Sequence, residues 1–175
     1  MLNIGSTLQR FSLVHDHGIR LDVRALLASG TLPIYIAWGV ALSAALAARA
    51  WDFAGELLAS ARAEGVSDAI LSDAQVAATL MAMDVMHCQI RHQSAGRAKD
   101  RRTRGQRLSS LSRPASDARA FALFALAAGI MNGCAICGDA DRKELHGEGH
   151  IDEREALRIA TVVAEAASAA GFPDP

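Results

Sequence analysis

Residues 121–138 read FALFALAAGIMNGCAICG, a run of apolar and small residues that leads into an Asn-Gly pair and a C-x-x-C pair. The apolar positions of this run recur at helical spacing, as at Phe121, Phe124 and Ala128. Ser116 precedes the run and belongs to the residue types that cap helices. We therefore predict a helix that begins after Ser116 and continues to about Met131. The Asn-Gly pair is a typical turn, so a second helix should begin at the first cysteine.

The composition of the whole chain agrees with a helical protein that has one substantial core. Its 175 residues are 51% hydrophobic and 21% charged, and they include 36 alanines but only 5% aromatic residues. Alanine favours closely packed helices, whereas strands are rich in aromatic and β-branched residues. We predict an all-α fold and exclude a β-sandwich or barrel. The net charge of −1 gives no overall attraction to nucleic acid or to an anionic membrane.

Capping residues, glycines and apolar periodicity predict the other helices. The first is a short helix over about 21–29 that is closed by Gly30. Two helices follow between Pro33 and about Arg62, with a break near Trp51 and Asp52 and a stop at Gly65. A long helix runs from a Ser72/Gln75 capping box to about His92, and a last helix runs from an Asp152/Glu155 capping box to Gly171. The most apolar segment, 32–48, contains Pro, Tyr, Gly and Ser and is rich in alanine. We interpret it as a buried helix and not as a membrane span. The last helix could serve core packing or a subunit interface.

We predict one all-α domain over 1–175, built from two helical halves around one core. The N-terminal half covers about 21–95, a basic linker covers 96–116, and the C-terminal half covers 117–171. The linker has seven basic residues opposed by one acid, and no aromatic residue for base stacking lies among them. We interpret it as a solvated connection, with a nucleic-acid site as a minor hypothesis that Arg101, Arg102 and Arg104 would carry.

Cys134 and Cys137 are the chemical centre of the sequence. The first turn of a helix has unpaired N–H groups and a partial positive charge, and both stabilise a thiolate. In a C-x-x-C pair one thiolate can attack a peroxide or a disulfide, and the other thiol can then close an intramolecular disulfide. The motif by itself also fits a metal site or a chance pair of cysteines. Cys88 lies in an apolar helix and is interpreted as a small packing residue.

The segment from Phe121 to Gly171, FALFALAAGIMNGCAICGDADRKELHGEGHIDEREALRIATVVAEAASAAG, resembles the active-site half of the alkyl hydroperoxidase D family in the carboxymuconolactone decarboxylase-like superfamily. AWGVALSAALAARA and AATLMAMDVMHCQIRHQ resemble earlier helices of that family, so the similarity covers about 35–171. The resemblance implies an all-helical homo-oligomer, often a trimer, with thiol peroxidase or disulfide reductase activity. It also implies peroxiredoxin and lipoyl-protein partners. By motif position, Cys137 matches the peroxide-attacking cysteine and Cys134 its disulfide partner.

Two positions depart from the family pattern that the resemblance supplies. The family has a histidine four residues after the second cysteine, where this chain has Asp141, and a glutamate twelve residues before the first cysteine, where it has Ala122. An ionised Asp141 disfavours a nearby thiolate, so we expect a weakened proton relay and a slow peroxidase. Asp141 itself and His146 are candidates for a replacement relay, and further histidines are available at His87, His92 and His150.

Two alternatives to the enzyme remain open. Cys134, Cys137, His146 and His150 form a set of soft and imidazole ligands that suits structural zinc, although the spacing is shorter than in zinc fingers. The missing relay also fits a catalytically degenerate relative that serves in assembly or partner binding. Residues 1–20 lack a secretory signal pattern, so we expect a cytoplasmic protein. We expect no membrane partner, and a nucleic-acid partner only under the minor hypothesis for the linker. Apart from the redox-active disulfide we expect no cofactor.

Overall fold

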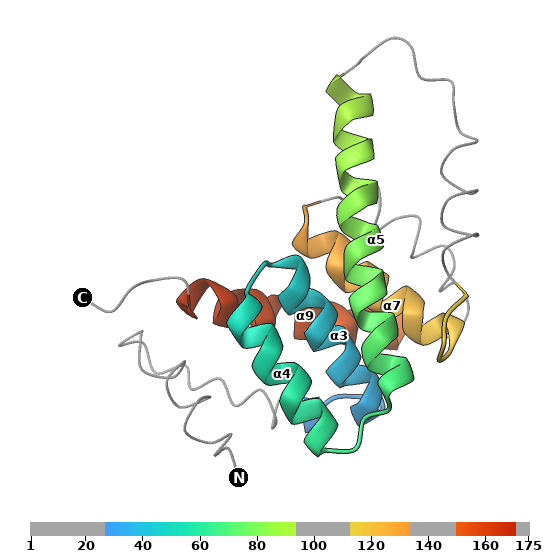
Figure 1. Ribbon diagram of the computed structural model, residues 1–175, viewed down its shortest axis with the longest axis vertical. Helices are drawn as coiled ribbons and strands as arrows, with labels where there is room; N and C mark the ends of the chain where they lie inside the picture. The colour runs from blue at the N-terminus through green and yellow to red at the C-terminus, as the bar shows by residue number, and fades with distance from the viewer. Residues whose placement is uncertain (1–26, 94–112, 134–149, 171–175) are drawn as a thin grey trace.

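The computed structural model describes residues 27–93, 113–133 and 150–170, and these residues form five helices and no strand. The all-α prediction is confirmed for this part of the chain. The helices are α3 (Ile34–Ala47), α4 (Trp51–Ala63), α5 (Asp68–Gln93), α7 (Ala118–Met131) and α9 (His150–Ala170) (Figure 1). Most of the helix predicted over 21–29 and of the basic linker lies outside the described residues.

Helix α3 is the centre of the bundle, because it packs against each of the other four helices. Residues 37–45 are buried without exception, so this helix is covered on all sides. A helix that is apolar all round belongs in such a place. The interpretation of this segment as a buried helix is therefore confirmed. In the described part of the chain only Asp68–Met86 of α5 is long and apolar enough to span a membrane, and half of that stretch is buried inside the bundle.

Helices α3 and α7 approach each other closely. Gly39 faces the ring of Phe124, and a Cβ added at Gly39 would lie 2.5 Å from that ring. One turn further along α3, the Ser43 hydroxyl donates a hydrogen bond of 2.8 Å to the backbone carbonyl of Phe124, and this bond is buried. Small residues on α3 thus let the two backbones approach, and the hydroxyl fixes the position of α7 along α3.

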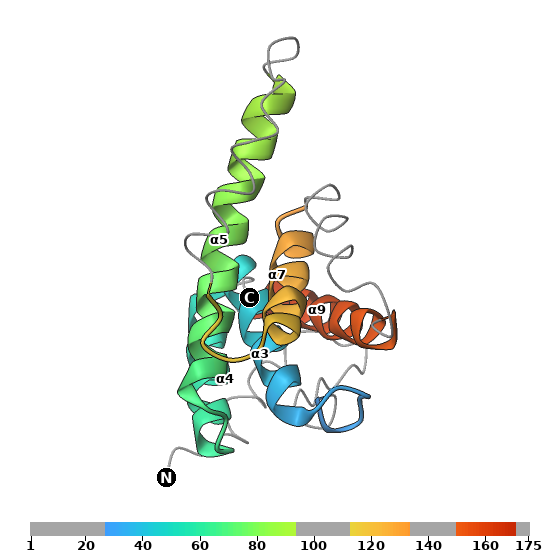
Figure 2. The same ribbon diagram turned by 90° about the vertical axis from the view of Figure 1, so that its right-hand side faces the viewer.

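Helices α3 and α7 have their C-terminal ends at the same end of the bundle. Figures 1 and 2 show that α3 and α7 run side by side toward the same end of the bundle, and that α5 continues well beyond them at that end. The projecting part of α5 is poorly covered, since the Met83 and Met86 side chains are 47% and 58% exposed.

By contrast, α9 crosses the bundle with its inner face in the core. That inner face consists of Ala156, Ile159, Ala160, Val163 and Ala166. The described face of the last helix therefore serves core packing.

The order and extent of the helices agree with the predictions from periodicity. The helical structure is interrupted between α3 and α4 at residues 48–50, directly before Trp51, as predicted. Helix α4 ends at Ala63 and is followed by the predicted stop, Gly65, which has a positive φ. Helix α5 ends at Gln93, α7 at Met131 and α9 at Ala170, each within one residue of the prediction.

The three predicted capping residues are wrong. Helix α5 begins at Asp68, so Ser72 lies inside it, and α9 begins at His150, so Asp152 also lies inside a helix. Helix α7 is capped by Asp117, whose carboxylate accepts a 3.0 Å hydrogen bond from the Ala120 N–H, and not by Ser116. Two of the misassigned side chains have tertiary partners instead: Ser116 binds Asp73, and Asp152 binds Arg119.

Candidate functional site

Cys134, Cys137, Asp141 and His146 lie outside the described residues, and their arrangement stays a prediction. The structure does describe the chain up to Gly133, the residue before the first cysteine. Consecutive Cα atoms lie about 3.8 Å apart across a trans peptide bond. The C-x-x-C segment therefore starts at the C-terminal end of α7, and the surroundings of this end can be described.

Helix α7 ends in the turn that the sequence predicts. The Asn132 N–H and its side-chain amide both donate to the Ala128 carbonyl, at 3.1 and 2.9 Å. The Gly133 N–H then donates to the Ile130 carbonyl at 2.8 Å, and Gly133 has a φ of 72°. A glycine adopts this left-handed conformation without a steric penalty from a Cβ atom. The turn thus fixes the direction in which the chain leaves the helix toward the cysteines.

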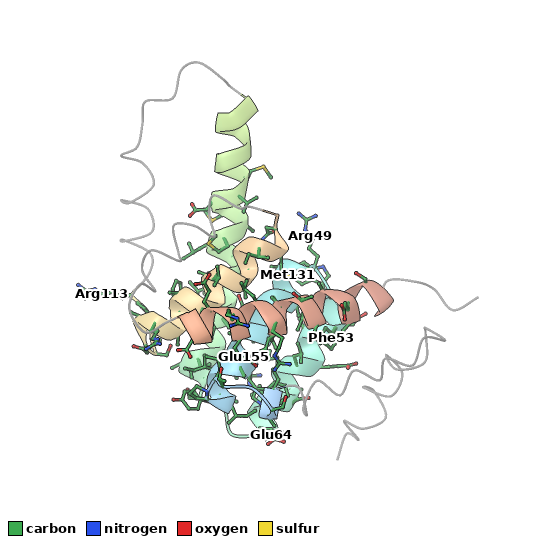
Figure 3. The ribbon with its side chains drawn as sticks, turned by 180° about the vertical axis from the view of Figure 1, so that it is seen from behind. Arg49, Phe53, Glu64, Arg113, Met131 and Glu155 are labelled. Atoms are coloured by element: carbon green, nitrogen blue, oxygen red, sulfur yellow. The ribbon has the colours of Figure 1, made fainter. Side chains whose placement is uncertain are left out.

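The surroundings of this end are open and partly apolar. Ile130 is 37% exposed, and Met131 is half-buried. Figure 3 shows Met131 and Arg49 at the same end of the bundle, while Glu64 lies at the opposite end. Arg49 follows Ala48, the C-cap residue of α3, and is exposed. The described chain therefore reaches Gly133 at the same end of the bundle as Arg49, an arginine that the sequence analysis did not single out.

The opposite end of α7 is held by polar contacts from two other helices. The buried carboxylate of Asp73 on α5 accepts hydrogen bonds from the Ala115 N–H, the Ser116 N–H and the Ser116 hydroxyl, at 2.9, 2.8 and 2.5 Å. Arg119 on α7 forms a 2.6 Å ion pair with Asp152 on α9. These contacts anchor the start of the helix whose other end leads to the cysteines.

The positions discussed for a proton relay are only partly described. Ala122 lies on α7 and is 7% exposed, so a glutamate at this position would place a carboxylate in the core. His87 and His92 lie in the C-terminal part of α5, and His150 is the first residue of α9, but their side chains are not among those described. The structure thus assigns no replacement for the relay.

The zinc alternative and the role of Cys88 stay untested. Cys134, Cys137 and His146 lie outside the described residues, and the ligand set stays a prediction. Within the part of the chain that is described, no three His, Cys, Asp or Glu side chains are grouped so that they could bind a metal ion. Cys88 lies in α5, as predicted.

Two residues with a bearing on the site were missed by the sequence analysis. Asp73 reaches Ser116 from a distance of 43 residues along the chain, and no local pattern marks such a contact. Arg49 does leave a signal, because it follows a helix at the position that usually holds glycine. The structure explains this signal, since Arg49 has a φ of 60° and is the one non-glycine residue with positive φ among those described.

Known proteins were compared with the full sequence. No protein-family model matches the chain. Curated proteins named alkyl hydroperoxide reductase AhpD do match it over most of its length, and three of them are described below. The protein from Anaeromyxobacter dehalogenans (strain 2CP-C) is 37% identical over 86% of this chain and 82% of its own length. The one from Methylobacterium sp. (strain 4-46) is 35% identical over 86% of each chain.

The third relative, from Streptomyces coelicolor, is 30% identical over 87% of both chains. Identities at this level along nearly the whole sequence exceed what a shared helical composition produces. The matches agree with the family that the sequence resembles. Their names indicate an oxidoreductase function related to alkyl hydroperoxides. On these grounds the chain belongs to the AhpD family of alkyl hydroperoxide reductases.

Proposed function

We propose that the protein is a thiol-dependent peroxidase or disulfide oxidoreductase in which Cys137 attacks the substrate and Cys134 closes the disulfide. The similarity to proteins named alkyl hydroperoxide reductase, over more than four fifths of the chain, is the observation that carries this proposal. The turn at Asn132 and Gly133 supports it, because this turn stands directly before the C-x-x-C pair in the sequence and the neighbouring Ile130 is exposed.

The reaction needs no group beyond the two thiols, a hydroperoxide and a dithiol donor. The Cys137 thiolate attacks the terminal oxygen of the hydroperoxide, an S–O bond forms, the O–O bond breaks, and the alcohol leaves after taking a proton. The Cys134 thiol then attacks the sulfenic sulfur, an S–S bond forms, and water leaves. A dithiol of the dihydrolipoamide class returns the disulfide to two thiols by exchange.

Replacing Cys137 by serine tests this assignment directly. A serine hydroxyl is not ionised near neutral pH and is a poor nucleophile toward peroxide, so turnover with dihydrolipoamide should fall at least about a hundredfold. The measurement is the rate of consumption of an organic hydroperoxide, with circular dichroism to check that the helices persist. Wild-type turnover in Cys137→Ser would overturn the assignment.

We propose further that the proton relay is weakened by Ala122 and Asp141. Introducing the family residues by Ala122→Glu together with Asp141→His should raise the thiolate fraction or the rate of turnover. The structure adds a cost to this experiment, because Ala122 is buried and the new carboxylate would lower the stability. Asp141→His alone is therefore the matched variant. If neither variant gains thiolate or rate, the relay has been replaced by other groups or peroxide is not the substrate.

The second candidate function is a catalytically degenerate assembly or binding protein, which the departures at Ala122 and Asp141 favour. It predicts partner capture that depends on neither cysteine. A zinc site at Cys134, Cys137, His146 and His150 predicts instead one metal ion per chain and unfolding on chelation. Under the enzyme proposal, the two cysteines form a redox-active disulfide and bind no zinc.

The remaining parts of the proposal concern assembly and setting. We place the protein in the cytoplasm as a homo-oligomer, with a trimer as the first arrangement to test and with peroxiredoxin and lipoyl proteins as partners. The exposed Met83 and Met86 on the projecting part of α5 support an assembly, because such apolar surface is usually covered. Sedimentation analysis of the wild type and of Met86→Glu tests it, and a monomeric wild type would contradict it.

A further inference from the structure

The exposed side of α5 carries no charge between Ile70 and Met86. The exposed residues of this stretch are Ser72, Gln75, Val76, Thr79, Ala82, Met83 and Met86. Its two acids do not belong to this side, because Asp73 is buried and binds Ser116, and Asp84 is half-buried. The exposed positions recur at spacings of three, four and seven residues, so they lie along one side of the helix. These seven residues form what we call the neutral face of α5.

The neutral face differs from the exposed side of α9. The exposed residues of α9 include Arg154 and Glu165, as is usual for a helix whose outer side meets water. On the neutral face, by contrast, Met86, Met83 and Val76 are 58%, 47% and 37% exposed. A continuous apolar patch of this kind marks a surface that another molecule covers. The composition of the neutral face is therefore that of a contact surface.

The polar group at the centre of this face needs no water. The Thr79 hydroxyl donates a 2.9 Å hydrogen bond to the Gln75 carbonyl on its own helix. A hydroxyl without such a partner would oppose association, because its hydrogen bond to water would be lost and not replaced. The neutral face can thus be covered without leaving the Thr79 hydroxyl unsatisfied.

A membrane is a poor match for the neutral face. Asp68–Met86 has the length and hydropathy of a membrane span, but half of this stretch is buried inside the bundle. A helix that lies on a membrane surface usually carries Lys and Arg beside its apolar face, and residues 69–86 contain neither. The face also has no charge with which to attract a nucleic acid or a charged protein. An uncharged protein surface is the better match.

The surface that fits best is a second α5 that runs in the opposite direction. The large residues Met83 and Met86 lie on the part of α5 that projects beyond the other helices in Figures 1 and 2, and the smaller Ser72 and Val76 lie nearer its start. In an antiparallel pair centred at Thr79, Met86 of one copy lies opposite Ser72 of the other. Met83 likewise lies beside Val76, so large residues meet small ones along the face. A parallel pair would place Met86 against Met86 and Ser72 against Ser72, which leaves a gap at one end.

We propose that the neutral face of α5 binds the neutral face of a second copy of this chain, antiparallel, about a two-fold axis at Thr79. The face extends from Ser72 to Met86, which is about 21 Å along the helix axis. Seven residues on each side are fewer than the roughly 20 to 30 of a standard interface, so the pair should dissociate on dilution. The two-fold axis gives an even number of chains, two or, where the proposed trimer forms through another surface, six. The inference rests on the proposed homo-oligomer, whose contact surface it names, and does not depend on the thiol chemistry.

The test measures the mass of the full-length protein by analytical ultracentrifugation over about a hundredfold range of concentration. We expect the wild type to form an assembly with an even number of chains that dissociates on dilution. Thr79→Arg places two cations against each other at the axis, so the dissociation constant of the pair should rise at least about tenfold. Thr161→Arg is the matched control, because Thr161 is an exposed threonine of α9 whose hydroxyl also donates a 2.9 Å bond within its helix, to the Leu157 carbonyl. This variant should associate like the wild type.

A mixture of two variants tests the position of the axis. Thr79→Glu alone should also weaken the pair, because two carboxylates then face each other. An equimolar mixture of Thr79→Arg and Thr79→Glu should associate again, because opposite charges then meet across the axis. Arginine and glutamate are both good helix formers, so each variant should keep the circular dichroism of the wild type. A mixture that associates no better than either variant would contradict an axis at Thr79.

A wild type that is monomeric at every concentration, or that contains three chains only, would overturn the inference. Thr79→Arg that associates like the wild type would do the same, and so would a monomer that binds phosphatidylcholine vesicles through this face. The mass measurement requires no peroxide turnover. If the wild type pairs through α5 but lacks peroxidase activity, the proposed enzyme fails and the pairing stands. If it consumes peroxide while Thr79→Arg leaves its assembly unchanged, the reverse holds.

Discussion

The two ends of α7 differ in how the rest of the molecule holds them. At the N-terminal end, Asp117 caps the helix, the Asp73 carboxylate accepts three hydrogen bonds from the preceding turn, and Arg119 pairs with Asp152. At the C-terminal end, Asn132 bonds only within its own helix in the described structure, and Ile130 is exposed. One helix thus joins an anchored base to an open end, and the cysteines follow the open end. This difference suits the proposed thiol chemistry, in which the site admits a substrate and forms a disulfide.

Asp73→Ala should have the largest effect, because it removes the anchor on the base. A hydrogen bond to a charged group contributes about 1.5 to 3 kcal/mol, and three donors lose their acceptor here. We expect the free energy of unfolding to fall by about 3 kcal/mol in urea denaturation. Asp73→Asn keeps the shape and should lose less. Thiol alkylation of the folded variant should stay at the wild-type rate, and a large change in that rate would show that the two ends are coupled.

Gly133→Ala tests the open end. A Cβ at this position meets no other group within 4 Å, so the expected cost of about 1 kcal/mol comes from the left-handed backbone alone. Gly65→Ala is the matched control, because Gly65 also follows a helix end with positive φ and open space. Both variants should lose similar stability, and only Gly133→Ala should change the rate of thiol alkylation. Equal alkylation rates in the two variants would contradict a link between this turn and the thiols.

Arg119→Ala should have the smallest effect. The ion pair with Asp152 has good geometry, but the Arg119 side chain is 50% exposed. Exposed pairs contribute between about 0.2 and 1 kcal/mol, and salt screens them. We expect a loss of about 0.5 kcal/mol at low salt that shrinks in 1 M sodium chloride. A loss above about 2 kcal/mol would mean that this contact holds α9 in place and is more than a surface pair.

The sequence predicts the described helices well and their caps poorly, for one physical reason. Periodicity and the glycine stops act locally, so the ends at Gly65 and Met131 follow from neighbouring residues. A side-chain oxygen, by contrast, can form a hydrogen bond either to a nearby backbone N–H or to a partner on another helix. Ser116 and Asp152 take tertiary partners, and the local pattern that predicted caps there contains no sign of Asp73 or Arg119.

In the candidate site, too, the local features can be predicted from the sequence and the tertiary ones cannot. The C-x-x-C pair and the turn before it can be recognised from consecutive residues, and the turn is confirmed at Asn132 and Gly133. That Arg49 and Met131 lie at the same end of the bundle (Figure 3) depends on how α3 and α7 pack, through Ser43 and Phe124, which are 81 residues apart in the chain. Packing between residues so far apart in the chain cannot be predicted from local sequence patterns. The one local signal is an arginine at a helix end, where glycine is usual.

The most direct test of the central claim is the intact mass of the anaerobically purified protein after thiol alkylation, with its zinc content, before and after one equivalent of an organic hydroperoxide. We predict three alkylated thiols and no zinc before peroxide, and one alkylated thiol afterwards, because Cys134 and Cys137 close a disulfide while Cys88 stays reduced. One zinc ion per chain that protects the thiols, or three free thiols after peroxide, would contradict the account and favour a structural site or a binding role.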